Sequence, residues 1–241
     1  MSLKALSVIL VFSTVQILAQ PSNQVKSDPA WKQYTEAGAA RGENITGGFG
    51  YYRLNRRTAT SFHDLRLFAY GLQDNTFIYL RFKNSQKYQT LTKLYRFTTL
   101  AYRKNTRTGV GLQYQYNQGL GAFLMQYGSG HTTAEIGLAY DMSDYLNDTH
   151  KTSYLKGGAY WDHDQRRFAT KLEVEYFYQI SDLNVTDLTR AQILAEVILP
   201  LKNGFSLNIN FESENYFSAN EQDANSINIA LGWQGSLSWK Y

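Results

Sequence analysis

Cysteine is absent from the 241 residues, and proline occurs only three times. Without cysteine, the chain has no disulfide framework, no cysteine-ligated metal site and no lipoprotein anchor. Pro21 and Pro29 lie near the N-terminus, and the only later proline is Pro200. Because proline removes a hydrogen bond from a β-ladder, its near-absence after residue 29 is typical of long, uninterrupted strands.

The chain also lacks a basic run and a long hydrophobic run. A net charge of +4 with no basic cluster argues against a nucleic-acid partner. Residues 1–19 combine Lys4 with a short apolar stretch and end at Ala19, which predicts a secretory signal peptide rather than a transmembrane helix. No later segment is apolar enough to span a membrane as a helix, so a span after export would have to be a closed β-barrel.

The dominant pattern is a strict alternation of apolar and polar residues. Near the C-terminus, in SINIALGWQGSLSWKY, the odd-numbered residues from Ile227 to Tyr241 are mainly apolar and the even-numbered ones are mainly polar. Soluble strands usually have about five or six residues, whereas a tilted transmembrane strand needs about nine to eleven. This segment is therefore long enough to cross a bilayer.

The same alternation recurs in nine earlier segments: 45–51, 65–69, 78–82, 110–116, 134–140, 155–161, 168–178, 191–199 and 205–211. Two more segments, 91–103 and 120–128, resemble strands, but their faces are mixed and their parity stays open. Together with the last segment, these predict an all-β transmembrane antiparallel up-and-down barrel of about 12 strands over residues 43–241, preceded by a periplasmic segment at residues 20–42.

The connections predict which ends of the strands face the periplasm. Every second connection reads as a short turn: GLQDN, KNTRT, GSGHT, DHDQR and PLKNG. Several others are longer: SDYLNDTHK, SDLNVTDL and NYFSANEQDAN. Short periplasmic turns and longer external loops are typical of barrels in the outer membrane of Gram-negative bacteria. We therefore expect a monomer in that membrane, surrounded by its lipid.

Aromatic residues of the apolar parity lie near predicted strand ends, where aromatic girdles contact the membrane interfaces. The predicted girdle residues are Tyr51, Tyr116, Tyr140, Tyr178 and Trp161. Leu237, Trp239 and Tyr241 continue the alternation to the terminal aromatic residue, a pattern that resembles the signal read by the barrel-assembly machinery. An ordinary lipid-facing strand would also explain these three residues.

Charged residues occupy the polar parity, and a charge on the lipid face would cost about 2–4 kcal/mol near the midplane. The predicted lumen-facing residues are Asp64, Arg66, Arg81, Lys83, Glu135, Asp141, Lys156, Lys171, Glu173, Glu175, Arg190, Glu196 and Glu212. Basic residues dominate the early strands and acidic residues the later ones. Opposed charged walls indicate a narrow channel or a barrel that binds small solutes or ions. Alternatively, the charges pair and plug the lumen of a structural or adhesive protein that acts through residues 143–151 and 215–225.

Two short motifs could suggest enzymatic chemistry. Ser129 and His131 in GSGH have the residue types of an outer-membrane lipid hydrolase, and His163 lies between Asp162 and Asp164, residue types that can bind a metal. Glycine-flanked serine and charged residues are also ordinary in turns. We expect no enzymatic activity, no metal and no cofactor.

Two long segments carry a family resemblance. TTAEIGLAYDMSDYLNDTHKTSYLKGGAYW and ILPLKNGFSLNINFESENYFSANEQDANSINIALGW resemble the salt-induced outer-membrane proteins, and the resemblance extends from Gly42 to the end of the chain. The first-hairpin region reads RLNRRTATS, where the family has a Gly-Asn-Thr element. The resemblance implies an outer-membrane barrel, without a settled activity.

Overall fold

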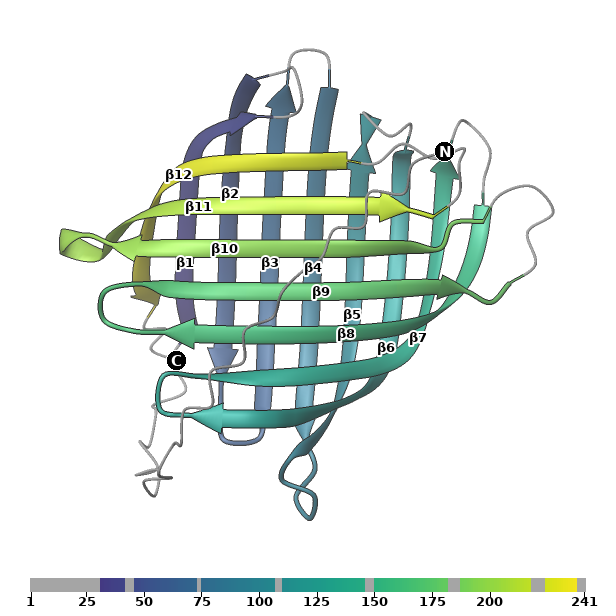
Figure 1. Cartoon of the computed structure of the whole chain (residues 1–241), viewed down its shortest axis with the longest axis horizontal. Coiled ribbons are helices and arrows are strands. Elements are labelled where there is room, and N and C mark those ends of the chain that lie inside the picture. Colours follow the sequence, from purple (N-terminus) through teal and green to yellow (C-terminus); the bar gives the residue numbers. More distant parts are fainter. Residues whose placement is uncertain are drawn as a thin grey trace, which may run out of the picture.

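Each strand pairs with its neighbours in sequence, and the first pairs with the last, so the sheet closes into one antiparallel barrel (Figure 1). The computed structural model describes residues 31–41, 46–72, 75–106, 110–145, 150–181, 187–217 and 224–237. Its strands are β1 (Trp31–Arg41), β2 (Thr46–Arg57), β3 (Ser61–Leu72), β4 (Asn75–Lys87), β5 (Leu94–Asn105), β6 (Val110–Tyr127), β7 (Gly130–Tyr145), β8 (His150–Asp164), β9 (Ala169–Gln179), β10 (Arg190–Pro200), β11 (Phe205–Tyr216) and β12 (Ala224–Leu237). A 3₁₀ turn, η2 (Lys202–Gly204), precedes β11. The predicted fold class is therefore confirmed.

The assignment of residues 20–42 to a periplasmic segment outside the barrel is wrong for residues 31–41. These residues form β1, which pairs with β2 on one side and β12 on the other. The sequence WKQYTEAGAAR has no apolar alternation, because Tyr34 and Glu36 share one face while the opposite face carries the small Ala37 and Ala39. Backbone pairing holds this segment in the sheet, because a barrel closes only when the edges of β2 and β12 both have a hydrogen-bonded partner. The predicted signal peptide, residues 1–19, lies outside the described residues.

The segments 110–116 and 120–128 are not two strands. Residues 110–127 form β6, a single strand of 18 residues. Two glycines of this strand allow close packing: a Cβ on Gly119 would lie 2.2 Å from the carbonyl oxygen of Ile136, and one on Gly121 would lie 2.2 Å from the ring of Tyr95. The predicted count of twelve is therefore correct although one strand was missed and another was divided.

These two errors also affect the predicted topology. In an antiparallel barrel of sequential strands, consecutive connections lie at opposite ends. The connection from β1 to β2 and every second one after it define the loop end; the remaining connections, the start of β1 and the end of β12 define the terminal end. GLQDN and KNTRT, predicted in the periplasm, thus lie at the same end as the longer connections 180–189 and 217–223. GSGHT, DHDQR and PLKNG lie at the terminal end.

Side chains alternate between an apolar outer face and a mainly polar interior. Outward residues such as Leu67, Ile136 and Ile229 are 42%, 60% and 54% exposed, as expected for a face that contacts lipid. In β5, whose parity stayed open, Thr99 and Arg103 are buried in the interior, and in β6 the predicted parity of residues 110–116 is correct, because Tyr114 and Tyr116 are exposed while Asn117 is buried. Within the described ranges, no helix is long and apolar enough to cross a membrane.

Strand β2 has the opposite parity to the predicted one. Phe49 is buried and packs with Tyr70 and Phe77, and the ring of Tyr51 contacts those of Tyr34 and Phe68. These aromatic side chains therefore point into the barrel. A shift of one residue exchanges the two faces of a strand, so the alternation of β2 was real but its direction was wrong.

Candidate functional site in the barrel interior

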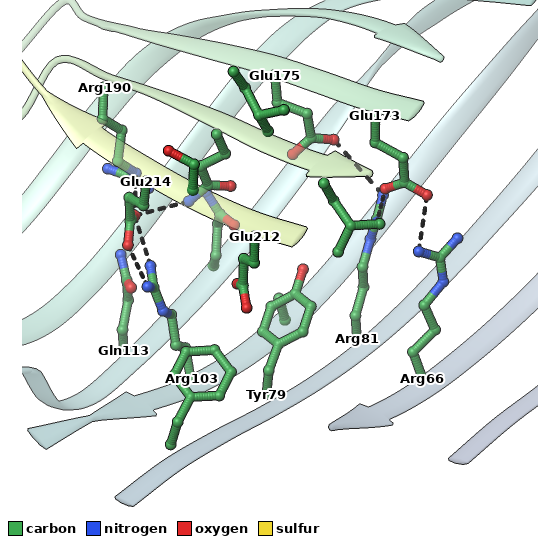
Figure 2. Close-up of a pocket in the computed structure, with 17 residues that line it drawn as sticks. Arg66, Tyr79, Arg81, Arg103, Gln113, Glu173, Glu175, Arg190, Glu212 and Glu214 are labelled. Atoms are coloured by element: carbon green, nitrogen blue, oxygen red, sulfur yellow. Dashed lines mark hydrogen bonds and ion pairs between the residues drawn. The ribbon is translucent and has the colours of Figure 1, made fainter. Parts of the chain in front are cut away.

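Ion pairs cross the lumen between strands on opposite walls. Arg66 Nη1 on β3 lies 2.9 Å from Glu173 Oε1 on β9, and Arg81 Nη1 on β4 lies 3.3 Å from the other oxygen of Glu173. Arg81 Nη2 is also 3.7 Å from Glu175 Oε1. Because β3 and β4 are separated from β9 by several strands in both directions around the single-layered barrel, these side chains meet across its interior (Figure 2).

The cross-lumen pairs extend into a continuous network. Asp64 accepts hydrogen bonds from Arg53 at 2.5 Å and from Arg66 at 2.6 Å. On the far wall, Lys156 Nζ donates to Glu175 Oε1 at 2.7 Å. The central network comprises Arg53, Asp64, Arg66, Arg81, Lys156, Glu173 and Glu175. It joins the wall formed by β2, β3 and β4 to the wall formed by β8 and β9 across the interior.

A second network lies nearer the loop end. Arg103 on β5 makes a bidentate ion pair with Glu214 on β11, with Nη1 2.7 Å from Oε1. Arg190 connects Glu214, at 3.4 Å, with Asp141, at 3.3 Å. Its guanidinium also lies over the ring of Phe177, 4.7 Å from the centroid, and the side chain is 2% exposed. The loop-end network thus comprises Arg103, Asp141, Arg190 and Glu214.

Two further pairs lie outside these networks. Lys83 Nζ on β4 is 2.5 Å from Glu135 Oε1 on β7, which also accepts a hydrogen bond from Tyr95 at 2.9 Å. Lys171 Nζ on β9 donates to Glu196 on the adjacent β10 at 2.9 Å. The opposed charges predicted from the sequence are thus largely joined in direct contacts rather than held apart on separate walls.

A cavity of about 80 Å³ lies between the two networks. Arg66, Arg81, Glu173 and Glu175 bound it on one side, and Arg103, Arg190 and Glu214 bound it on the other (Figure 2). Tyr79, Gln115 and Glu212 also line it. The charged and amide side chains that line this cavity can hydrogen-bond to water or to a small polar molecule.

All thirteen predicted lumen residues face the interior, and twelve of them take part in the ion pairs described above. The thirteenth, Glu212, lines the cavity without an ion pair to any described residue. The sequence patterns did not identify Arg53, Arg103 or Glu214. Arg53 lies on the strand of reversed parity, Arg103 lies on one of open parity, and Glu214 lies beyond the predicted segment 205–211.

Part of the interior is aromatic rather than charged. Phe49, Tyr70 and Phe77 form a buried cluster from β2, β3 and β4, against which Tyr51 and Phe68 pack. The rings of Tyr70 and Phe77 are stacked with centroids 4.8 Å apart. The sequences of β3 and β4 indicate that their aromatic residues point inward. Phe68 and Tyr70 have the parity of Asp64 and Arg66, and Phe77 has the parity of Arg81 and Lys83. The interior is therefore filled by two chemically different groups of side chains.

The predicted girdle residues have different positions. Tyr51 is not a girdle residue, because its ring lies inside the barrel. Tyr116 faces outward but lies well within β6 rather than at its end. Tyr140, Tyr178 and Trp161 face outward and are 43%, 53% and 39% exposed.

Trp161 belongs to an outward aromatic cluster at the terminal end. Its Nε1 donates to the hydroxyl of Tyr127 at 2.7 Å, and its ring stacks on His163, which also contacts Phe168. Rings with a polar edge suit a membrane interface. Of the predicted assembly signal, Leu237 is the last residue of β12, whereas Trp239 and Tyr241 lie outside the described residues.

The geometry of the two short motifs differs from that of a hydrolase. Ser129 Oγ lies 3.4 Å from His163 Nδ1, not beside His131, and His163 Nδ1 is also 3.3 Å from the Tyr127 hydroxyl. His131 instead contacts Asp162 at 3.2 Å. In the described part of the chain, no carboxylate orients His163 and no group of three metal-ligating side chains is present. A base oriented by a third group, as in a catalytic triad, is thus not assembled here.

Comparison with known proteins identifies the fold class. No family model and no curated protein matches the sequence, so membership of the salt-induced family stays a prediction. The structure is similar to the NanC porin, with a TM-score of 0.56 and 7% identity over 83% of this chain and 98% of the porin. It is also similar to an outer-membrane channel from Pseudomonas putida F1, with a TM-score of 0.51 and 6% identity over 90% of this chain and 100% of that one.

At 6–7% identity the likeness concerns the fold alone. The protein is a twelve-stranded barrel of the type found in bacterial outer membranes.

Proposed function

We propose that the protein is a narrow channel in the outer membrane of a Gram-negative bacterium, permeable to small ions or polar solutes. The ion pairs from Arg66 and Arg81 to Glu173 form its constriction. The observation that carries this proposal is the charged interior itself, in which twelve predicted lumen charges and three further ones are paired. The barrel fold provides the membrane passage that such an interior would line.

Stability alone does not favour this interior. Taking charged groups out of water is expensive, and apolar side chains of similar volume often replace a buried ion pair without loss of stability. A barrel that served only as a scaffold could be filled by an extension of the aromatic cluster around Phe49 and Phe77. The charges therefore support a role in solute passage.

A closed barrel is the second candidate, and the direct contacts across the lumen favour it. Arg66 and Glu173 are 2.9 Å apart, a separation that leaves no passage between the two side chains. In that case the ion pairs would hold the barrel shut, and the protein would act through its connections at the loop end, as a structural or adhesive surface protein.

Conductance in a planar bilayer distinguishes the two candidates. We expect small unit conductance from the natural protein and a larger one from the triple variant Arg66→Ser, Arg81→Ser, Glu173→Ser, because the variant removes the constriction. The control is Leu80→Ala with Val174→Ala. These residues precede Arg81 and follow Glu173 in the sequence but face outward, so shortening them should leave conductance unchanged. Folding of each variant is verified by the gel shift between unheated and heated samples. If neither the natural protein nor the folded triple variant conducts, the channel proposal is wrong.

A further inference from the structure

Side chains around the cavity between the central and loop-end networks carry hydrogen-bonding groups that no described residue satisfies. Glu212 on β11 lines the cavity, and its carboxylate has neither an ion pair nor a hydrogen bond with any described residue. In Figure 2 it lies between Glu214 with Arg103 on one side and Arg81 on the other. A free carboxylate in such a site is an acceptor that lacks a donor.

The side chains of Gln115 on β6 and Arg103 on the neighbouring β5 also line this cavity. Nε2 of Gln115 and Nε of Arg103 are fully buried, and neither has a hydrogen-bond partner among the described residues. Buried polar atoms are nearly always paired, so each exception calls for an explanation. Strands β5 and β6 lie on the wall opposite β11, so the free donors and the free acceptor belong to opposite sides of the lumen.

The charges that line the cavity are balanced. Four guanidinium groups, from Arg66, Arg81, Arg103 and Arg190, are matched by four carboxylates, from Glu173, Glu175, Glu212 and Glu214. A simple cation or anion would disturb this balance. A molecule that carries both charges preserves it, with its positive group against Glu212 and its negative group against Gln115 and Arg103.

The size of the cavity limits the occupant. At about 30 Å³ for each water in the liquid, a cavity of about 80 Å³ holds about three molecules. An amino acid as small as glycine, with five non-hydrogen atoms, is comparable in size.

We propose that this cavity binds a small zwitterion of the amino-acid class, whose ammonium group donates to Glu212 and whose carboxylate accepts from Gln115 and Arg103. The inference rests on the proposed function, in which solutes enter the lumen, and it identifies the class of solute.

Isothermal titration calorimetry of the folded, detergent-solubilised barrel with glycine tests the proposal. We expect saturable binding to the natural protein and about tenfold weaker binding to Glu212→Gln, which keeps the shape of the side chain but loses the charge-assisted hydrogen bond. The control is Asp164→Asn, which removes an exposed carboxylate at the terminal end and should bind glycine as the natural protein does.

Methylammonium and acetate serve as single-charge probes, and neither should bind as tightly as glycine. If methylammonium binds as tightly as glycine, the site is a simple cation site at Glu212. If acetate binds as tightly as glycine, it is an anion site. Either result overturns the proposal. So does the absence of glycine binding, or unchanged binding to Glu212→Gln. Because calorimetry requires no conductance, a barrel that binds glycine but does not conduct refutes the channel alone, and one that conducts but does not bind glycine refutes the zwitterion site alone.

Discussion

At the scale of single residues, Lys83 shows what pairing does to a lumen charge. Its ammonium group contacts Glu135, and Glu135 is held in addition by the hydroxyl of Tyr95. Both charged side chains are almost entirely removed from solvent. Removal of one member of such a pair leaves the other buried without a counter-charge, whereas removal of both does not.

We therefore expect Lys83→Met to lower the free energy of unfolding by about 3–5 kcal/mol. The double variant Lys83→Met, Glu135→Leu should recover most of this loss, because no unpaired charge remains and apolar side chains fill the space. Urea unfolding of the barrel in lipid vesicles, followed by tryptophan fluorescence, measures both values. A double variant as unstable as the single one would show that the pair itself, rather than the unpaired charge, accounts for the loss.

Parity identified thirteen charged residues that face the lumen, but it did not determine their partners. Arg66 pairs with Glu173, which is 107 positions away in the sequence. The local sequence around either residue does not indicate that the two will meet. Glu212 has the same parity as the paired carboxylates. Only the arrangement of opposite walls distinguishes it from them.

At the scale of the strand, β1 and β2 show where alternation is an insufficient signal. Alternation fixes that two faces differ but not which face is inside, and in β2 the aromatic face is the inner one because it joins the cluster around Tyr70 and Phe77. In β1 the outward side chains Ala37 and Ala39 are small, and Glu36 faces the interior, where it accepts a hydrogen bond from Asn210. Strands β2 and β12 each need a hydrogen-bonding partner at their free edge, and this need explains the β1 strand better than the residues of β1 do.

The role of β1 in closure can be tested at Ala37, which lies opposite Gly50 of β2 and Leu231 of β12. Ala37→Pro removes a backbone donor from a strand that is paired on both sides, so we expect a strongly reduced yield of assembled barrel. Ala37→Ser retains the donor and should assemble normally. The fraction of protein that shows the gel shift between unheated and heated samples measures assembly. Normal assembly of Ala37→Pro would contradict the role of residues 31–41 in closing the barrel.

At the scale of the whole molecule, the paired ends of β1 and β12 define a terminal end and an opposite loop end. Outer-membrane barrels have short periplasmic turns and longer external loops, and the connections 180–189 and 217–223 are at the loop end. We therefore expect the loop end outside the cell. This orientation reverses the side predicted from sequence for GLQDN and KNTRT.

Cysteine labelling of intact cells tests this orientation, and the absence of natural cysteine makes each introduced thiol unique. Thr106→Cys, at the exposed residue directly after β5 in the connection to β6, should react with a membrane-impermeant reagent. Lys202→Cys, in the turn before β11, should react only after the cells are broken. Labelling of Lys202→Cys but not of Thr106→Cys on intact cells would show that the barrel has the opposite orientation in the membrane.

The sequence by itself determined the fold class and the inward direction of thirteen charges, because a side-chain period of two and the cost of a charge in lipid act on each strand separately. The tertiary structure decided what depends on several strands at once. It recruited residues 31–41 to close the sheet, turned Phe49 and Tyr51 toward the aromatic cluster, and joined lumen charges into networks that leave Glu212 without an ion pair to any described residue. These features follow from barrel closure, which brings opposite walls within contact distance, and no local pattern records which walls will meet.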